Sequence, residues 1–305
     1  MKKIILALII FTSCSYGAFY DMGAGARSIG LGGSFTAIAD DANGMYYNIA
    51  GIGQIKEMSF TGTYSSYFTS FYEGYAAFVL PLFKKGAIGI SWTDTVVPYY
   101  NENVITLGYS LPINKTSYVG LGVRMFMKGY SPNEWTVLNP DFATMNAMGF
   151  GVCVSGFTKL GDDLTVGVSL ENLNQPDVSI KYPDPVPSIY RLGVSYKVFK
   201  GLTAGAQGDM RNGEIKGEVG SEYWISTKFL ESFGVTDSSI GLRAGYVLGT
   251  SNLSSVSVGF SFLLPVKFAD LRLDYSLTIP MGYVDGSSTH RFTINISEPK
   301  PLHSI

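Results

Sequence analysis

Residues 119–127 read VGLGVRMFM. Every odd position holds an apolar side chain, whereas the even positions hold Gly120, Gly122, Arg124 and Phe126. Successive side chains of a β-strand point to opposite sides, so a repeat of two residues indicates a strand with two unlike faces. One face of this strand is apolar, and the other carries glycine and a charged residue.

The same alternation recurs to the end of the chain. About fourteen segments of roughly 8 to 13 residues fit it, an even number and a length typical of a closed barrel that crosses a membrane. They begin near Glu57, Tyr72, Gly86, Glu102, Ser117, Thr144, Asp163, Ser188, Gly201, Glu214, Ser238, Ser254, Phe268 and Thr289. A soluble sandwich would show more Lys and Glu on its outer face, but charged residues make up only 15% of the chain. The sequence therefore predicts an all-β fold, a transmembrane antiparallel β-barrel of about 14 strands.

The N-terminus, MKKIILALIIFTSCSYGA, has the pattern of an export signal. Two lysines precede an apolar run that is too short to span a bilayer, and small residues follow it up to Gly17. We expect a Sec-type signal over residues 1–17, cleaved before Ala18. A second interpretation takes residues 11–14 as a loose lipoprotein box, in which Cys14 would be acylated. No later run of about 18 apolar residues follows, which excludes membrane helices.

The links between the expected strands alternate in length. Barrels of outer membranes have short periplasmic turns and longer external loops, so this alternation favours a barrel. The short links lie near residues 84–85, 112–116, 159–162 and 199–200, and the long ones near 129–143, 174–187 and 280–288. The link from Thr227 to Asp237 is long on the short side and breaks the pattern.

The charged positions of these strands must face the lumen, because an arginine on the lipid face at the midplane costs about 2 to 4 kcal/mol. Seven charged side chains are expected there: Arg124, Glu171, Arg191, Arg243, Arg272, Asp274 and Arg291. They pair with one another or with whatever fills the lumen; the alternative is that they line a substrate path. Glycines on the same face relieve strand curvature or make room for an inserted segment.

A glycine-rich stretch, GAGARSIGLGGSFTAIADDANGMYYNIAGIG, occupies residues 23–53, between the signal and the first strand. Residues 22–53 resemble the opening segment of the FadL-like outer-membrane barrels, and more closely that of the PorV/PorQ branch. Shorter pieces such as Glu222-Tyr223-Trp224 extend the likeness over the mature chain. The resemblance implies that residues 18–55 form an N-terminal hatch in the lumen, followed by a barrel over 56–297 and a tail over 298–305.

Polar side chains of this hatch are expected to pair with the barrel wall. They are Arg27, Asp40, Asp41, Asn43, Tyr46 and Asn48. Adjacent Asp40 and Asp41 make a poor calcium cage without further oxygen ligands, so salt bridges to the wall are favoured. Ile49 stands where the family has a proline, which removes a fixed φ, and we expect a looser turn. The glycines do not make a dinucleotide loop, since no βαβ unit surrounds them.

The sequence offers little for catalysis. The only histidines are His290 and His303, too few for a histidine metal cluster or a Ser/Cys triad, so we expect no enzyme, no cofactor and no metal. A net charge of -2 gives no electrostatic footprint for nucleic acid.

The resemblance implies a multi-pass protein of the outer membrane. It would contact membrane lipid and pass hydrophobic or amphiphilic small-molecule ligands across passively. The alternative is a PorV-like component of type IX protein secretion, a platform for exported cargo, in which Tyr130 and Trp135 would make external-loop contacts. A structural barrel without transport is a third interpretation.

Overall fold

The computed structural model describes residues 18–67, 71–82, 85–134, 136–140, 145–227, 238–250, 254–281 and 288–299. The expected export signal with Cys14, the loop residue Trp135 and most of the expected tail lie outside the described residues.

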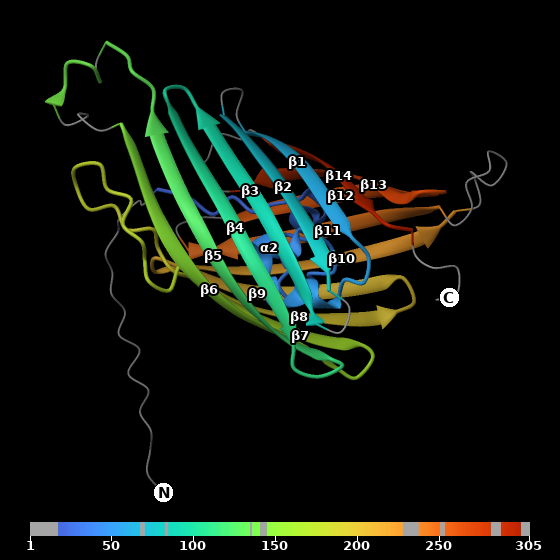
Figure 1. Ribbon diagram of the computed structural model, residues 1–305. Helices are drawn as coiled ribbons and strands as arrows, with labels where there is room; N and C mark the ends of the chain where they lie inside the picture. The colour runs from blue at the N-terminus through green and yellow to red at the C-terminus, as the bar shows by residue number, and fades with distance from the viewer. Residues whose placement is uncertain are drawn as a thin grey trace, which may run out of the picture.

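Fourteen antiparallel strands form a closed barrel, which β14 completes by pairing with β1 (Figure 1). Their bounds are β1 Ser59–Tyr67, β2 Phe71–Pro81, β3 Ala87–Val97, β4 Tyr100–Pro112, β5 Ser117–Tyr130, β6 Asn146–Leu160, β7 Leu164–Glu171, β8 Ile189–Phe199, β9 Leu202–Arg211, β10 Glu214–Ser226, β11 Ser239–Gly249, β12 Ser254–Val266, β13 Ala269–Pro280 and β14 Thr289–Ser297. The predicted fold and the number of strands are confirmed, and each predicted start lies within two residues of the observed one.

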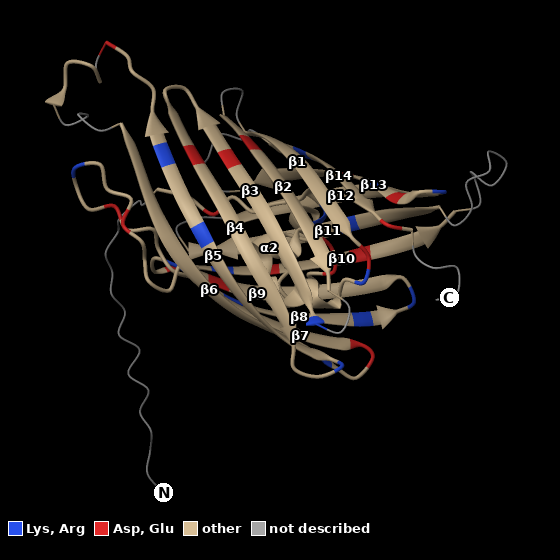
Figure 2. Cartoon of the chain, in the orientation of Figure 1, with Lys and Arg blue, Asp and Glu red and all other residues tan. Residues whose placement is uncertain are grey.

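The two faces of the strands differ as the alternation predicts. In β5, Leu121 and Val123 are 56% and 49% exposed, whereas Gly122 is buried and Arg124 is only 8% exposed. Long uncharged stretches run along the strands of the wall (Figure 2). Large apolar side chains exposed on the outside include Ile88, Trp92, Leu107, Leu121, Val123, Phe150, Leu192, Tyr196, Val219, Phe292 and Ile294. This belt suits contact with lipid hydrocarbon. Among the described residues, no helix is long and apolar enough to cross a membrane.

The stretch from residue 18 to residue 55, here called the lumenal segment, lies inside the barrel (Figure 1). It contains the short helices α1 (Ala26–Gly30) and α2 (Gly44–Tyr47) and the 3-10 helix η1 (Ile49–Gln54). Helix α1 packs against β11 to β14, and η1 packs against β3 to β6. The segment therefore contacts opposite sides of the wall.

Glycines of the wall let the backbone of the lumenal segment approach closely. A Cβ added at Gly120 would collide with the backbone nitrogen of Ala50, and one at Gly220 would collide with the carbonyl of Leu31. The inward-facing glycines therefore make room for the segment.

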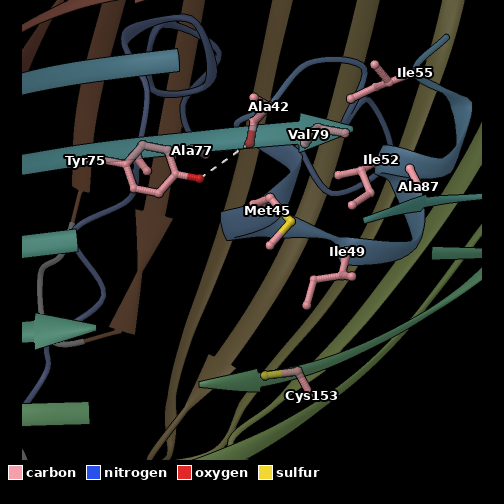
Figure 3. Close-up of a cluster of buried hydrophobic side chains, with 11 residues drawn as sticks. Ala42, Met45, Ile49, Ile52, Ile55, Tyr75, Ala77, Val79, Ala87 and Cys153 are labelled. Carbon is pink, nitrogen blue, oxygen red and sulfur yellow. Dashed lines mark hydrogen bonds between the residues drawn. The ribbon is translucent and has the colours of Figure 1, made fainter. Parts of the chain in front are cut away.

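An apolar cluster joins η1 and α2 to the first strands. Met45, Ile49 and Ile52 pack with Ala77, Val79, Ala87 and Cys153, among others (Figure 3). Asn48 begins the 3-10 turn, and its side chain accepts hydrogen bonds from the backbone nitrogens of Ala50 and Gly51. At Ile49, where a looser turn was expected, the side chain is only 4% exposed and the Asn48 cap holds the turn.

The two ends of the barrel differ in their links. One end, called the long-loop end, carries the links 131–145, 172–188 and 281–288, and the other is called the short-turn end. The alternation is less regular than the sequence predicts, because the long-loop end also holds tight links at Pro98-Tyr99 and Asn212-Gly213. Asn212 and Gly213 both have positive φ, at 48° and 80°, as a tight hairpin requires. Most of the irregular link Thr227 to Asp237 lies outside the described residues.

Candidate functional site in the barrel lumen

Arg27 of α1 joins the lumenal segment to the wall at three carboxylates. Its Nε donates to Glu222 Oε2 at 2.8 Å, and its Nη2 donates to Glu222 Oε1 at 2.6 Å. Its Nη1 lies 2.5 Å from Asp40 and 3.0 Å from Asp41. The Arg27 and Glu222 side chains are 6% and 3% exposed, so this bidentate pair is shielded from water.

Further pairs close these contacts into a loop of alternating charge. Glu222 accepts from Arg243 Nε at 2.5 Å, and Arg243 reaches Asp274 through the Ser261 hydroxyl. Asp274 accepts from Arg272, which donates to Asp41 at 2.6 Å. The six charged members of this ionic ring are Arg27, Glu222, Arg243, Asp274, Arg272 and Asp41. Two members come from the lumenal segment and four from β10, β11 and β13, so the ring fixes α1 against that side of the wall.

A second ionic cluster centres on Arg191 of β8. Its guanidinium contacts Asp21 at 2.5 Å, Asp209 at 3.2 Å and Glu171. Glu171 also pairs with Arg124 Nη1 at 2.5 Å. Each charge thus has an opposite charge beside it, as buried charges require.

The remaining residues expected in the segment have distinct contacts. Tyr46 donates to Asp21 at 2.5 Å, and Asn43 Nδ2 donates to Asp41 at 2.9 Å. Asn48 Nδ2 donates to the carbonyls of Thr36 at 2.8 Å and Gly156 at 3.1 Å, the latter in β6. Asp40 differs from the others, because its side chain is 45% exposed.

Arg291 of β14 hydrogen-bonds a backbone carbonyl of the segment and a hydroxyl group of the wall. Its Nη2 donates to the Met22 carbonyl at 2.9 Å and to the Tyr67 hydroxyl at 2.5 Å. Its Nε is buried and has no hydrogen-bond partner within the described part of the chain. Arg291 is only 4% exposed, so an unsatisfied donor is held next to the lumen.

Two cavities lie on either side of α1. The long-loop cavity has a volume of about 280 Å³, and the short-turn cavity has a volume of about 350 Å³. They share no lining residue: α1 contributes Ile29 to the first and Arg27 to the second. Helix α1 and the ionic ring therefore lie between these two cavities.

The lining of the long-loop cavity is amphiphilic. Tyr20, Met22, Ile29, Tyr47, Tyr67 and Val247 supply apolar and aromatic surface. Arg191, Lys216 and Arg291 supply positive charge, Asp21, Asp209 and Glu218 supply negative charge, and Ser255, Ser257, Thr278 and Thr289 supply hydroxyl groups. The Lys216 ammonium lies 5.4 Å from the centre of the Tyr20 ring. Arg191 is paired with Asp21 and Asp209, whereas the hydrogen bonds of Arg291 within the described residues go to a carbonyl and a hydroxyl group. Arg291 is therefore the cation that suits the anionic group of a small molecule with an apolar body.

The link between β7 and β8 folds back into the mouth at the long-loop end. Val178 and Val186 are each 1% exposed and pack with Phe19 and Phe126. The backbone N–H groups of Asp184 and Ser179 donate to Asp177 Oδ1, and the Asp184 bond chiefly lowers the pKa of the Asp177 carboxyl below its usual range. The expected loop residue Tyr130 ends β5 and packs against Tyr100, with ring centres 4.7 Å apart.

Four acidic residues of the lumen were not predicted from the sequence. Asp21, Asp209, Glu218 and Glu222 face the lumen beside the expected charges. The alternation of β10 could have indicated Glu218 and Glu222, because the inward positions of that strand are the even ones. No such signal exists for Asp21, which lies outside the strands. No group of three or more His, Cys, Asp or Glu side chains in the described ranges is arranged to hold a metal ion.

No protein-family model matches the chain, and no curated protein matches it by sequence. Among solved structures the chain is similar to the CymD monoaromatic hydrocarbon channel, at 12% identity and a TM-score of 0.65, over 92% of this chain and 99% of that one. It is also similar to the toluene transporter TbuX of Ralstonia pickettii, at 12% identity and a TM-score of 0.61, over 91% and 98% of the two chains. A FadL homologue of Pseudomonas aeruginosa matches at 11% identity and a TM-score of 0.59, over 90% and 98%.

The fold is therefore that of the FadL-like outer-membrane barrels. At such low identity the likeness concerns the fold alone. The finer assignment to the PorV/PorQ branch stays a prediction.

Proposed function

We propose that this protein is an outer-membrane channel for the passive entry of small molecules that combine an apolar body with an anionic group. The observation that carries the proposal is the long-loop cavity, in which the Lys216 and Arg291 cations lie beside the aromatic rings of Tyr20 and Tyr67. Its volume of about 280 Å³ is close to the lower end of the usual range for ligand sites, which suits a small ligand. The solved structures with the same fold include channels for monoaromatic hydrocarbons and toluene.

The location follows from the two faces of the wall. The outside of the barrel presents a belt of exposed Leu, Ile, Val, Phe and Tyr, and the charged side chains are turned inward. A closed barrel satisfies its backbone hydrogen bonds without an edge, as a membrane-spanning structure must. In this orientation the long-loop end faces the outside of the cell and the short-turn end faces the periplasm.

The lumenal segment acts as the hatch of this channel. Helix α1 separates the two cavities, and the ionic ring fixes it against β10, β11 and β13. Passage from one cavity to the other requires α1 to leave this position. The described conformation is thus the closed one.

The test compares a matched pair of probes on the purified protein in detergent. 4-Methylbenzoate and toluene share one ring and one methyl group, and they differ in the carboxylate. Titration calorimetry should show saturable binding of 4-methylbenzoate, with weaker binding of toluene. A deletion strain should take up 4-methylbenzoate more slowly than its parent, and the complemented strain should recover.

Two results would contradict the proposal. The first is that neither probe binds and that the deletion strain takes up 4-methylbenzoate as fast as its parent. This result is expected if the protein is a structural barrel without transport. The second is co-purification of exported cargo proteins without any ligand binding, the outcome for a secretion platform of the PorV type.

A further inference from the structure

The lumenal segment begins between two carboxylates in the mouth of the barrel. The backbone nitrogen of Ala18 lies 3.3 Å from Asp184 Oδ1, and that of Phe19 donates to Glu102 Oε1 at 2.8 Å. Asp184 belongs to the link between β7 and β8, whereas Glu102 belongs to β4. Two separate elements therefore converge on the first two nitrogens of the segment.

Contacts on the other side hold the same residues in place. Arg211 of β9 donates to the carbonyls of Ala18 and Phe19 at 3.4 and 3.1 Å. The Phe19 ring is 8% exposed and meets Phe126 edge-on, with ring centres 4.9 Å apart. Ala18 is thus fixed by its neighbours, with its nitrogen directed at Asp184.

Cleavage of the export signal changes the chemistry of this nitrogen. Hydrolysis of the Gly17–Ala18 peptide bond adds one water, leaves Gly17 as a carboxylate on the released signal and leaves Ala18 with an α-ammonium group. We infer that the α-ammonium of the mature chain forms an ion pair with Asp184 and anchors the lumenal segment in the mouth. Processing then replaces a neutral hydrogen bond by a charge-assisted one, which is roughly twice as strong.

The carboxylate of Asp184 has room for this second cation. Lys128 of β5 pairs with its Oδ2, and the Ala18 nitrogen lies beside its Oδ1. The other charged groups nearby are Arg211, on the carbonyl side of Ala18, Asp177, which accepts from the Asp184 backbone N–H at 2.9 Å, and Glu102, which also accepts from the Tyr100 hydroxyl at 2.5 Å. The ion pair would join β5, the β7–β8 link and the start of the segment through one side chain. The inference rests on the predicted cleavage position and not on ligand transport.

The experiment uses the mature protein purified from membranes in detergent. Mass spectrometry of the N-terminal tryptic peptide should find a free amine at Ala18. Acetic anhydride at pH 8 then reports how much of this amine is unprotonated, because only that form reacts. Pairing with a carboxylate favours the ammonium form, so acetylation should be about tenfold slower in the native protein than in the denatured one.

Two variants distinguish loss of the ion pair from a general disturbance of the structure around Ala18. Asp184→Asn should restore acetylation to nearly the denatured rate, while Lys128→Met, which leaves Asp184 intact, should keep the amine protected. The inference is overturned by a mature chain that starts elsewhere, or by Lys128→Met reacting as fast as Asp184→Asn. An amine as reactive in the native wild type as in the denatured protein overturns it even where a variant does not fold.

Discussion

The Arg27 guanidinium and the Glu222 carboxylate face each other through two parallel hydrogen bonds, of 2.8 and 2.6 Å. This pair joins a five-residue helix in the lumen to strand β10 of the wall. Both side chains are almost fully buried, and each has further partners in the ionic ring. The observed position of α1 therefore depends on a small number of strong contacts.

Replacing Arg27 by Met should release α1 from the wall. The change leaves Glu222 and Asp41 without one of their cations, and breaking a buried pair in this way costs on the order of 3 kcal/mol. In planar bilayers the variant should show higher or more frequent conductance steps than the wild type. Asp40→Asn is the control, because that carboxylate is 45% exposed and should matter much less. Equal, wild-type conductance in both variants would contradict the role of the ring.

Adding a methyl group at Gly220 should displace the lumenal segment. The new Cβ would collide with the carbonyl of Leu31, whereas a Cβ at Gly208 of the neighbouring strand meets nothing within 4 Å. Gly220→Ala should expose the segment to added protease, and Gly208→Ala should leave it protected. Cleavage products after brief proteolysis distinguish the two variants. If both variants resist proteolysis equally, the close approach at Gly220 is not needed for docking.

Asn48 should contribute through two separable functions. Its side-chain oxygen caps η1, and its nitrogen donates to Thr36 and Gly156. Asn48→Ser keeps a side-chain oxygen for the cap and loses both amide donor bonds, while Asn48→Ala loses everything, with the cap alone worth about 1 kcal/mol. Folded barrels run as a separate band on a gel until they are heated, and the temperature at which this band disappears should fall in the order wild type, Asn48→Ser, Asn48→Ala. A reversed order of the two variants would refute this division.

The anionic part of the ligand should depend on Arg291. Arg291→Met removes a buried cation that lines the long-loop cavity, so affinity for 4-methylbenzoate should fall about tenfold, at the lower end of the effect expected for a charged hydrogen bond. Affinity for toluene should change little. Lys267→Met, in the link between β12 and β13 at the short-turn end, is the matched control for loss of a positive charge. Equal losses for both probes would show that the change disturbs the cavity and not the recognition of charge.

A charged residue on the outer face, near the middle of the membrane, should impair folding of the barrel. Val123 is 49% exposed near the middle of β5, and an arginine there would have to enter the hydrocarbon, at a cost of about 2 to 4 kcal/mol. Val123→Arg should lower the yield of folded barrel in lipid vesicles. Thr116→Arg, in the exposed link before β5, should fold like the wild type. Normal folding of Val123→Arg would contradict the assignment of this face to lipid.

The sequence specifies the wall of this barrel better than its contents. In β5, Gly122 and Arg124 alternate with Leu121 and Val123, and this local pattern is enough to predict a strand and its inward face. The local pattern does not predict which charged residues pair with one another. Arg27 and Glu222 are separated by 195 positions, so their pairing depends on how the segment lies in the lumen.

The mouth of the barrel shows the same limit. Residues 172–188 have the composition of an exposed recognition loop, but Val178 and Val186 turn inward onto Phe19 and Phe126. Only the tertiary arrangement brings residue 19 to this end of the barrel. Asp21 escaped prediction for the same reason, since its partner Arg191 is 170 positions away.

The filled lumen has a consequence for the cell that carries this protein. An empty ring of fourteen strands approaches the size at which barrels become water-filled pores. Here the lumenal segment occupies that space, and α1 lies between the long-loop cavity and the short-turn cavity. A cell could therefore make many copies of this barrel without giving hydrophilic solutes a standing water-filled route through its outer membrane.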